Sequence, residues 1–224
     1  MIVAKNISKI YFEGSKKEFY ALKNINFEIK KGSFVIFKGV SGSGKSTLLK
    51  SFYGDIPIKH GSLQISNQEV FKIKGNNLRH LRKDIGVIFQ DYKLINDYTI
   101  EENIMVPLKI NNYSDEVSKL QADNLLKHVK LSHRKGFYPN QLSGGEQQRV
   151  AVARALAHNP KIIIADEPTG NLDDFSAEVV WNLLKGANEQ LGITVVVVTH
   201  RVPKNLGINF RQLSIEDGII YEVS

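Results

Sequence analysis

A glycine-rich segment stands near the start of the chain, where residues 39–46 read GVSGSGKS. The apolar stretch before it predicts a strand and the STLLKSFY stretch after it predicts a helix, which is the context of a phosphate-binding loop. Backbone N–H groups and the helix N-terminus can then converge on phosphate oxygens. Lys45 would reach the β- and γ-phosphates, and the Ser46 hydroxyl would ligate Mg²⁺. The loop residues expected to contact nucleotide are Gly39, Ser41, Gly42, Ser43, Gly44, Lys45, Ser46 and Thr47.

Two carboxylates end another apolar stretch, IIIADE at residues 162–167. Open α/β sheets bind ligands at the carboxyl ends of their strands. Asp166 is suited to the Mg²⁺ shell, and Glu167 is suited to accept a proton from an attacking water or to orient that water. An acidic pair alone usually belongs to a solvated loop or a helix cap. Together with the phosphate-binding loop, it indicates hydrolysis of a nucleotide.

The segment NQLSGGEQQR, residues 140–149, begins a helix. Ser143 and Glu146 have the spacing of a capping box. Gly144 and Gly145 leave the first-turn N–H groups uncovered, which suits close approach by a phosphate. The loop at 39–46 already serves the chain's own nucleotide. A second anion-binding helix start therefore indicates a nucleotide held by another copy of the protein.

The hydrophobic pattern predicts the elements that must position these residues. Apolar runs in KIIIAD and ITVVVVTH predict central strands buried on both faces, with a helix between them, and this order implies a parallel sheet. Ser114 is a good N-cap within the mostly helical segment 91–156. Further strands are predicted at 2–11, 25–29, 34–37, 62–65, 69–71 and 86–89, and helices at 46–53, 77–83 and about 175–190. We therefore predict one α/β domain over 1–224, with a nucleotide-binding core at about 1–90 and 157–224 and a helical insertion at about 91–156.

Length and composition restrict the class of protein. A chain of 224 residues with 42% hydrophobic content can bury one sizeable core. Its longest apolar runs are far too short to cross a bilayer, and its start lacks a secretory signal, so we expect a cytoplasmic chain. It has no cysteine, which excludes disulfides and thiolate metal sites. The net charge of +7 is concentrated in the first 84 residues, where solvated faces explain it better than a nucleic-acid site.

The motifs together resemble the ATPase subunits of the ABC (ATP-binding cassette) family. The resemblance adds Tyr11, Gln90 in IFQD, Asp173 in IIIADEPTGNLDD and His200 in VVVVTH to the three stretches above. It implies that two cassettes pair head to tail, so that each LSGGEQQR signature closes over ATP on the partner's phosphate-binding loop. It also implies a P-loop NTPase fold of the ABC type, with a mainly parallel core sheet, an antiparallel β subdomain and a helical insertion.

The resemblance implies a role for each added residue. Tyr11 would stack on adenine, Gln90 would contact Mg²⁺ and the attacking water, Asp173 would lie at the dimer contact, and His200 would hold the γ-phosphate. Without the resemblance, Tyr11 reads as an ordinary strand aromatic, Gln90 as a surface residue and His200 as structural. The cofactors implied are ATP and Mg²⁺, and the implied assembly is an ATP-dependent homodimer.

Within the family, the segments IFQDYKLINDYTIEENIMVPL and ADEPTGNLDD look most like the subgroup that includes the cell-division ATPase FtsE. This likeness implies an FtsX-like integral membrane partner, contacts with other division proteins, and a place at the cytoplasmic face of the inner membrane. Lipoprotein-releasing and macrolide-exporting ATPases are close relatives and stay open as alternatives. Arg201 is a departure, since these proteins commonly carry an acidic residue after the histidine.

A soluble ABC-type ATPase that acts on DNA or ribosomes fits less well. Only 96 residues separate Lys45 from Leu142, and they show no sustained heptads of the kind that a long coiled-coil insertion requires. The chain has one copy of each motif, whereas ribosome-acting members usually fuse two cassettes. No nucleic-acid partner is expected. A scaffold without activity is disfavoured because the chain contains all the catalytic residue types.

Overall fold

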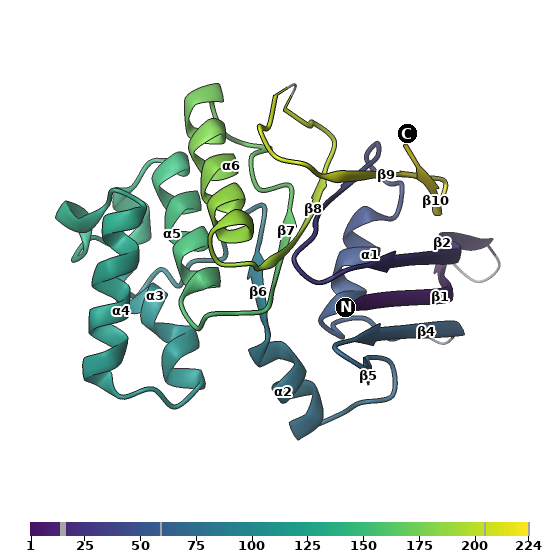
Figure 1. Cartoon of the computed structure of the whole chain (residues 1–224), viewed down its shortest axis with the longest axis horizontal. Coiled ribbons are helices and arrows are strands. Elements are labelled where there is room, and N and C mark those ends of the chain that lie inside the picture. Colours follow the sequence, from purple (N-terminus) through teal and green to yellow (C-terminus); the bar gives the residue numbers. More distant parts are fainter. Residues whose placement is uncertain (14–16, 59, 204, 224) are drawn as a thin grey trace. The chain divides into compact units, whose positions relative to one another are not determined.

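The computed structural model describes residues 1–13, 17–58, 60–203 and 205–223. The chain forms two compact units, the first made of 1–82 and 194–224 and the second of 83–193 (Figure 1). Strands β6 and β7 and helix α6 group with the helices α3–α5, so the second unit is larger than the helical insertion predicted at 91–156. That insertion stays a prediction about domain organisation. Within the described ranges, no helix is both long and apolar enough to cross a membrane.

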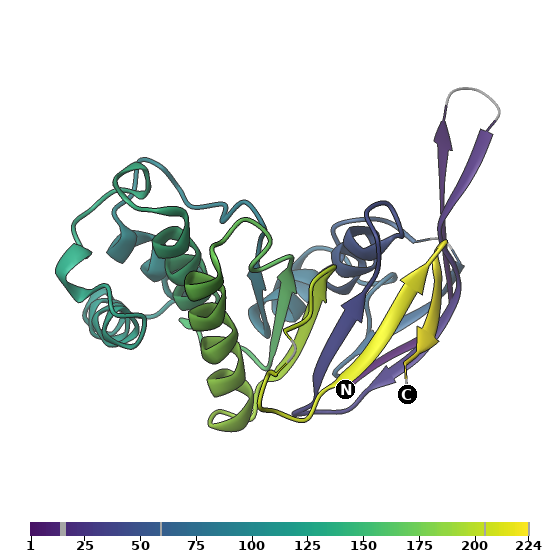
Figure 2. The same cartoon turned by 90° about the horizontal axis from the view of Figure 1, so that it is seen from above.

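The first unit contains an antiparallel sheet. Its strands, in spatial order, are β2 (Lys17–Ile29), β1 (Ile2–Glu13), β4 (His60–Ile65) and β5 (Gln68–Glu69). Ile2, Ala4 and Ile7 of β1 are buried, whereas the neighbouring Lys5 and Asn6 are exposed. The outer ends of β1 and β2 project beyond the rest of this unit in Figure 2. The antiparallel subdomain implied by the family resemblance is thus present.

A parallel set of strands forms the other part of the first unit. Strand β3 (Phe34–Lys38) pairs in parallel with β8 (Thr194–Thr199) on one side and β9 (Arg211–Glu216) on the other, and β10 (Ile219–Glu222) runs antiparallel to β9. Helix α1 (Lys45–Phe52) follows β3, and α2 (Asn76–Lys83) comes later. The ring of Phe27 on β2 lies 5.4 Å from that of Phe37 on β3 and 6.1 Å from that of Phe52 on α1. These aromatic contacts join the antiparallel sheet to the parallel strands.

The second unit is built from a parallel strand pair and four helices. The pair consists of β6 (Ile85–Ile88) and β7 (Ile162–Asp166), and the helices are α3 (Ile100–Ile110), α4 (Asp115–His128), α5 (Gly144–Leu156) and α6 (Asp174–Glu189). Helices α3, α4 and α5 share a buried apolar cluster that includes Ile104, Leu126 and Val150. The mostly helical character predicted for 91–156 is confirmed. Ser114 caps α4 as predicted, since its side chain accepts a hydrogen bond from Val117 N.

One strand prediction differs from the structure, and two strands of the structure were not predicted. The stretch EVF was expected to be a strand, but β5 contains only Gln68 and Glu69, because a tight turn at Ser66 and Asn67 pairs them with β4 and the chain then turns away. Strands β9 and β10 were not predicted. Their turn, Asp217–Gly218, has positive φ at both residues and is a standard two-residue hairpin signal.

Candidate nucleotide-binding site

The phosphate-binding loop connects β3 to α1 in the first unit, as predicted. Gly42 and Gly44 have φ values of 82° and 102°, which favour glycine. A Cβ on Gly44 would collide with the carbonyl oxygen of Ala21. Lys45 is buried, and its Nζ donates to the carbonyl oxygens of Gly39 at 2.9 Å and Val40 at 2.7 Å. The lysine is therefore held inside the loop, at the N-terminus of α1.

His200 lies at the same sheet edge as this loop. The parallel register of β3 with β8 ends at Lys38 opposite Thr199, so Gly39 and His200 are the residues that directly follow the two strands. The turn after β8 is fixed by Thr199, whose Oγ1 accepts from Arg201 N at 3.1 Å. The strand register thus brings the predicted γ-phosphate contact next to the predicted phosphate loop.

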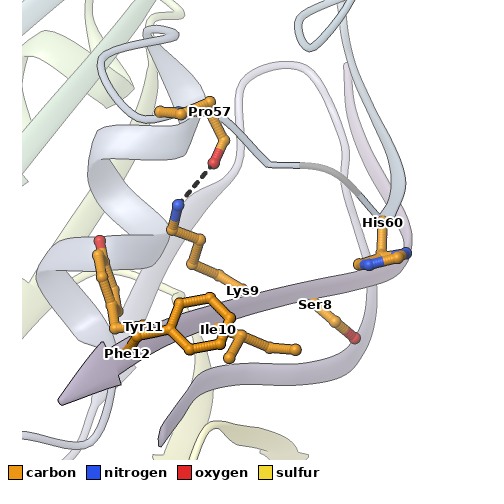
Figure 3. Close-up of a pocket in the computed structure, with 7 residues that line it drawn as sticks. All are labelled: Ser8, Lys9, Ile10, Tyr11, Phe12, Pro57 and His60. Atoms are coloured by element: carbon orange, nitrogen blue, oxygen red, sulfur yellow. Dashed lines mark hydrogen bonds between the residues drawn. The ribbon is translucent and has the colours of Figure 1, made fainter. Parts of the chain in front are cut away.

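Tyr11 projects from the outer part of β1 beside a cavity of about 540 Å³ (Figure 3). Lys9 points to the same side, where its Nζ donates to Pro57 O at 2.8 Å and lies 4.9 Å from the centroid of the Tyr11 ring. The Tyr11 side chain is 41% exposed. An exposed ring with a cation on it can offer its free surface to a nucleobase. The adenine contact itself stays a prediction.

The second unit brings Gln90, Asp166 and Glu167 to one edge of its strand pair. The register of β6 with β7 ends at Ile88 opposite Ala165, so Gln90 and the two carboxylates follow on adjacent strands. Gln90 and Glu167 meet around Gly170: a Cβ built on Gly170 would lie 3.7 Å from Gln90 Nε2 and 3.6 Å from Glu167 Cβ. Glu167 has a φ of 43°, which is unusual for a residue with a side chain. The two residues predicted to act on the attacking water, Glu167 from its strand end and Gln90 from the family resemblance, thus lie on either side of Gly170.

The residue types predicted for the Mg²⁺ shell suit that ion, and the site itself stays a prediction. The part of the chain that the structure describes contains no cluster of three His, Cys, Asp or Glu side chains that could hold a metal alone. Mg²⁺ keeps several waters and binds through one or two carboxylates together with substrate phosphates. Ser46, Gln90 and Asp166 offer a hydroxyl, an amide and a carboxylate, all hard oxygen ligands of the kind that this ion prefers.

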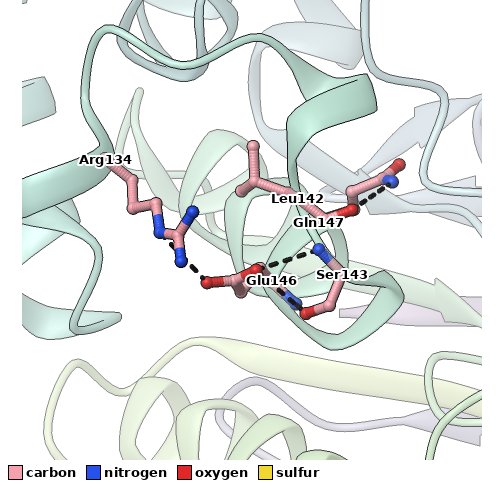
Figure 4. A network of polar contacts seen from close by, with 5 residues as sticks. All are labelled: Arg134, Leu142, Ser143, Glu146 and Gln147. Atoms are coloured by element: carbon pink, nitrogen blue, oxygen red, sulfur yellow. Dashed lines mark hydrogen bonds and ion pairs between the residues drawn. The ribbon is translucent and has the colours of Figure 1, made fainter.

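The capping box predicted at the start of α5 is present (Figure 4). Ser143 Oγ accepts from Glu146 N at 3.3 Å, and Glu146 Oε2 accepts from Ser143 N at 2.9 Å. Arg134 Nε lies 3.5 Å from Glu146 Oε1. The backbone hydrogen bond from Ser143 is the main cause that lowers the pKa of Glu146 below its usual value. Glu146 thus fixes the first turn of the signature helix.

This lowered pKa predicts a pH-dependent contribution to stability. A carboxyl whose pKa is depressed in the folded state stabilises the fold above its unfolded pKa, and the contribution is lost as the pH falls through the folded pKa. Glu146→Gln should therefore lower the free energy of unfolding at pH 7, and the difference from wild type should shrink toward pH 3. Urea unfolding at the two pH values measures it. A difference that does not change with pH would contradict this role.

Side chains of the same chain lie close to the two glycines of the signature. A Cβ on Gly144 would lie 2.8 Å from the hydroxyl oxygen of Tyr92, and a Cβ on Gly145 would collide with Ser176 Oγ. Ser176 belongs to the first turn of α6, where its N donates to Asp173 Oδ1 at 2.9 Å. This bond is the main cause that lowers the pKa of Asp173. The signature thus begins against two segments that carry other predicted site residues, Gln90 and Asp173.

Two residues that hold these segments, Arg154 and Tyr92, were not predicted from the sequence. Arg154 is largely buried at the end of α5 and donates to Tyr92 O and Lys93 O, each at 2.7 Å, and burial lowers its pKa to about 10. Tyr92 and Lys93 both have positive φ. Tyr92 lies only two residues after Gln90. Its packing against Gly144 joins positions 52 residues apart, so no local sequence pattern indicates the contact. A basic residue within the apolar face of α5 is the signal that could have indicated Arg154.

Comparison with known proteins gives consistent matches. The family model for ABC transporter matches residues 22–170. An uncharacterized ABC transporter ATP-binding protein of Methanocaldococcus jannaschii is 48% identical over 89% of each chain. Cell division ATP-binding protein FtsE of Streptococcus pneumoniae is 38% identical over 97% of this chain and 93% of its own. Methionine import ATP-binding protein MetN of Clostridium acetobutylicum is 40% identical over 99% of this chain and 68% of its own.

A solved structure agrees with these relatives. A dimeric, post-hydrolysis structure of the ATP-binding cassette MJ0796, bound to ADP and Pi, superposes with a TM-score of 0.90 at 41% identity and covers 100% of this chain and 99% of its own. The similarity therefore extends from the phosphate-binding loop to the remainder of the fold. The chain belongs to the ABC transporter family, as an ATP-binding cassette that hydrolyses ATP.

Proposed function

We propose that this cassette works in an FtsE-like complex, in which ATP-driven closure and opening of a dimer is transmitted through an FtsX-like membrane protein to control cell-wall hydrolysis. The observation that carries the proposal is the segment QDYKLI at 90–95, which resembles the corresponding segment of FtsE. This segment contacts the signature helix through Tyr92, which lies next to Gly144, and through Lys93 O, which accepts from Arg154. The similarity to FtsE over 97% of the chain supports it. We place the chain at the cytoplasmic face of the membrane, held there by its partner, with other division proteins as further contacts.

The chemistry proposed for each cassette uses the residues described above. Lys45 and the loop N–H groups bind the phosphates, and Glu167 activates the attacking water with Gln90 beside it. His200 contacts the γ-phosphate. Mg²⁺, when bound by Ser46, Gln90 and Asp166, would neutralise charge on the phosphates.

We propose that the dimer is formed by two copies of this chain, with the signature of one copy over the ATP of the other. The start of α5 supports this, because its first two residues are glycines and its N–H groups could meet a phosphate. The chain's own phosphate already has such a helix start at α1, where the N-cap residue is Gly44 and no side chain caps the helix. Asp173 would lie at the same contact, since Ser176, which it caps, packs against Gly145.

Ser143→Phe tests this arrangement. The bulky ring should leave ATP binding to the isolated chain unchanged but reduce turnover by about 100-fold, because it would obstruct the start of α5 where the partner's phosphate must approach. The variant also loses a helix cap, which costs about 1 kcal/mol. Ser114→Phe removes the equivalent cap of α4 and serves as the matched control, with turnover retained. Unchanged turnover in Ser143→Phe would remove the trans-site explanation of the signature.

Import of a small molecule is the second candidate, because MetN proteins match this chain as well as FtsE does. Lipoprotein release and macrolide export are further transport roles that would use the same catalytic residues. These alternatives differ from the cell-division role in the membrane partner. The partner is therefore what an experiment has to identify.

A crosslinked pull-down with the Glu167→Gln variant, made in the protein's own cells in the presence of ATP, decides between them. This variant should stay closed on ATP and retain its partner, and Lys45→Ala, which should not bind ATP, is the control. Recovery of an FtsX-like protein with division proteins, identified by mass spectrometry, supports the proposal. Recovery of a methionine, lipoprotein or drug permease would replace it with a transport role.

A further inference from the structure

A buried glutamine of the signature helix contacts the turn that carries Glu167. Gln148 lies on the inner face of α5 with 1% of its surface exposed. Its Nε2 donates to the carbonyl oxygen of Pro168 at 2.6 Å. Pro168 is the residue that follows Glu167 and is itself buried. A single hydrogen bond within the second unit therefore links the signature helix to the backbone beside the proposed catalytic carboxylate.

The turn at Glu167 needs such support. Its φ of 43° lies in the left-handed region, which residues with side chains seldom occupy unless neighbouring contacts hold them there. Within the turn, Gly170 N donates to Glu167 O at 3.1 Å. The bond from Gln148 adds a fixed point between these two residues. It holds the peptide between Pro168 and Thr169, one residue after Glu167, and so limits movement of the turn that carries the Glu167 side chain.

The cost of burying Gln148 indicates that its donor is needed. The other end of the amide, Gln148 Oε1, is buried and has no hydrogen-bond partner among the described residues. An unpaired buried amide oxygen is unfavourable, and methionine or leucine would fill similar space without that penalty. Since a purely apolar residue would avoid it, the amide at this position is best explained by the hydrogen bond that its other end makes.

We propose that Gln148 is a positioning residue that holds the Glu167 turn, and so ties the catalytic carboxylate of each chain to the helix whose start serves the partner's nucleotide. Only the link to the partner's nucleotide rests on the proposed trans arrangement of the dimer. One helix then connects the two ATP sites of the dimer. A shift of α5 on meeting the partner's phosphate would pull directly on the backbone next to Glu167.

Gln148→Met tests the proposal, because methionine keeps the size of the side chain and cannot donate. Hydrogen exchange of the isolated chain should rise several-fold in the peptide covering 166–172, since the turn loses its support. In the dimer, turnover should fall about 10-fold with the KM for ATP unchanged. Gln148→Leu has a different shape but also lacks the donor, and should behave in the same way.

Asn188→Leu is the matched control. Asn188 Nδ2 donates to Ile193 O at 2.7 Å, which is the same kind of bond at the far end of α6. Its loss should leave both the exchange of 166–172 and the turnover unchanged. Unaltered exchange in both Gln148 variants would overturn the proposal, and so would raised exchange with full turnover. If the wild-type chain shows no ATP turnover, the proposed function fails, while the exchange result still decides whether Gln148 holds the turn.

Discussion

Replacing Glu167 by glutamine should reduce ATP turnover by about 100-fold or more, because a positioned general base typically contributes 10²–10⁴ to the rate. The substitution keeps the shape of the side chain and removes its ability to accept a proton. Gln90 stays beside it, and the phosphate-binding loop belongs to other residues, so ATP affinity should be retained. Phosphate release under saturating ATP measures the turnover. Glu178→Gln, an exposed carboxylate on α6, is the control that should keep full activity.

The same variant should accumulate as an ATP-bound dimer. If closure needs ATP at the interface and opening needs hydrolysis, a chain that binds without hydrolysing stays closed. Light scattering with ATP should give twice the mass of the isolated chain, and ADP should not. A monomer in the presence of ATP would count against the head-to-tail arrangement, even if turnover were lost as expected.

Replacing Lys45 by alanine should instead remove nucleotide binding. The ammonium group forms charge-assisted hydrogen bonds with phosphate oxygens, and losing roughly 3 kcal/mol of such contacts weakens binding by about 100-fold. The alanine also leaves the Gly39 and Val40 carbonyl oxygens without the donor they now have, so the loop loses an internal support as well. Titration calorimetry with ATP measures the affinity.

Lys50→Ala is the matched control for Lys45→Ala. Lys50 lies on the same helix but is exposed, so its removal changes net charge equally without touching the loop. ATP affinity should be close to that of wild type. Normal affinity in Lys45→Ala would show that the loop at 39–46 has been assigned wrongly.

The sequence predicted those parts of the site that depend on local spacing. The capping box of Ser143 and Glu146 joins residues three apart, and the glycine-rich loop depends on a contiguous motif between a strand and a helix. The strand at 194–199 was predicted from an apolar run long enough to be buried on both faces, although its register with β3 was not. Each of these signals lies within one short window of sequence.

The contacts that the sequence did not reveal join distant positions. Gln148 meets Pro168 across 20 residues, and Arg154 meets Tyr92 across 62. Neither pair has a repeat or a spacing that marks it, because the meeting is created by packing of the whole second unit. The short strands β9 and β10 differ from these pairs, because their Asp217–Gly218 turn is a local signal in the sequence.

The side chains around the signature glycines affect which residues an inactive relative of this chain could carry at these two positions. The side chains of Tyr92 and Ser176 of the same molecule lie next to Gly144 and Gly145, so a larger residue there would force these side chains to move even in a chain that no longer met any nucleotide. A pseudoenzyme descended from this cassette would therefore have a packing reason to keep the double glycine while those two neighbours stayed. The glycine pair is therefore a marker of the packing of this unit, and activity in a relative is better judged from its counterparts of Lys45 and Glu167.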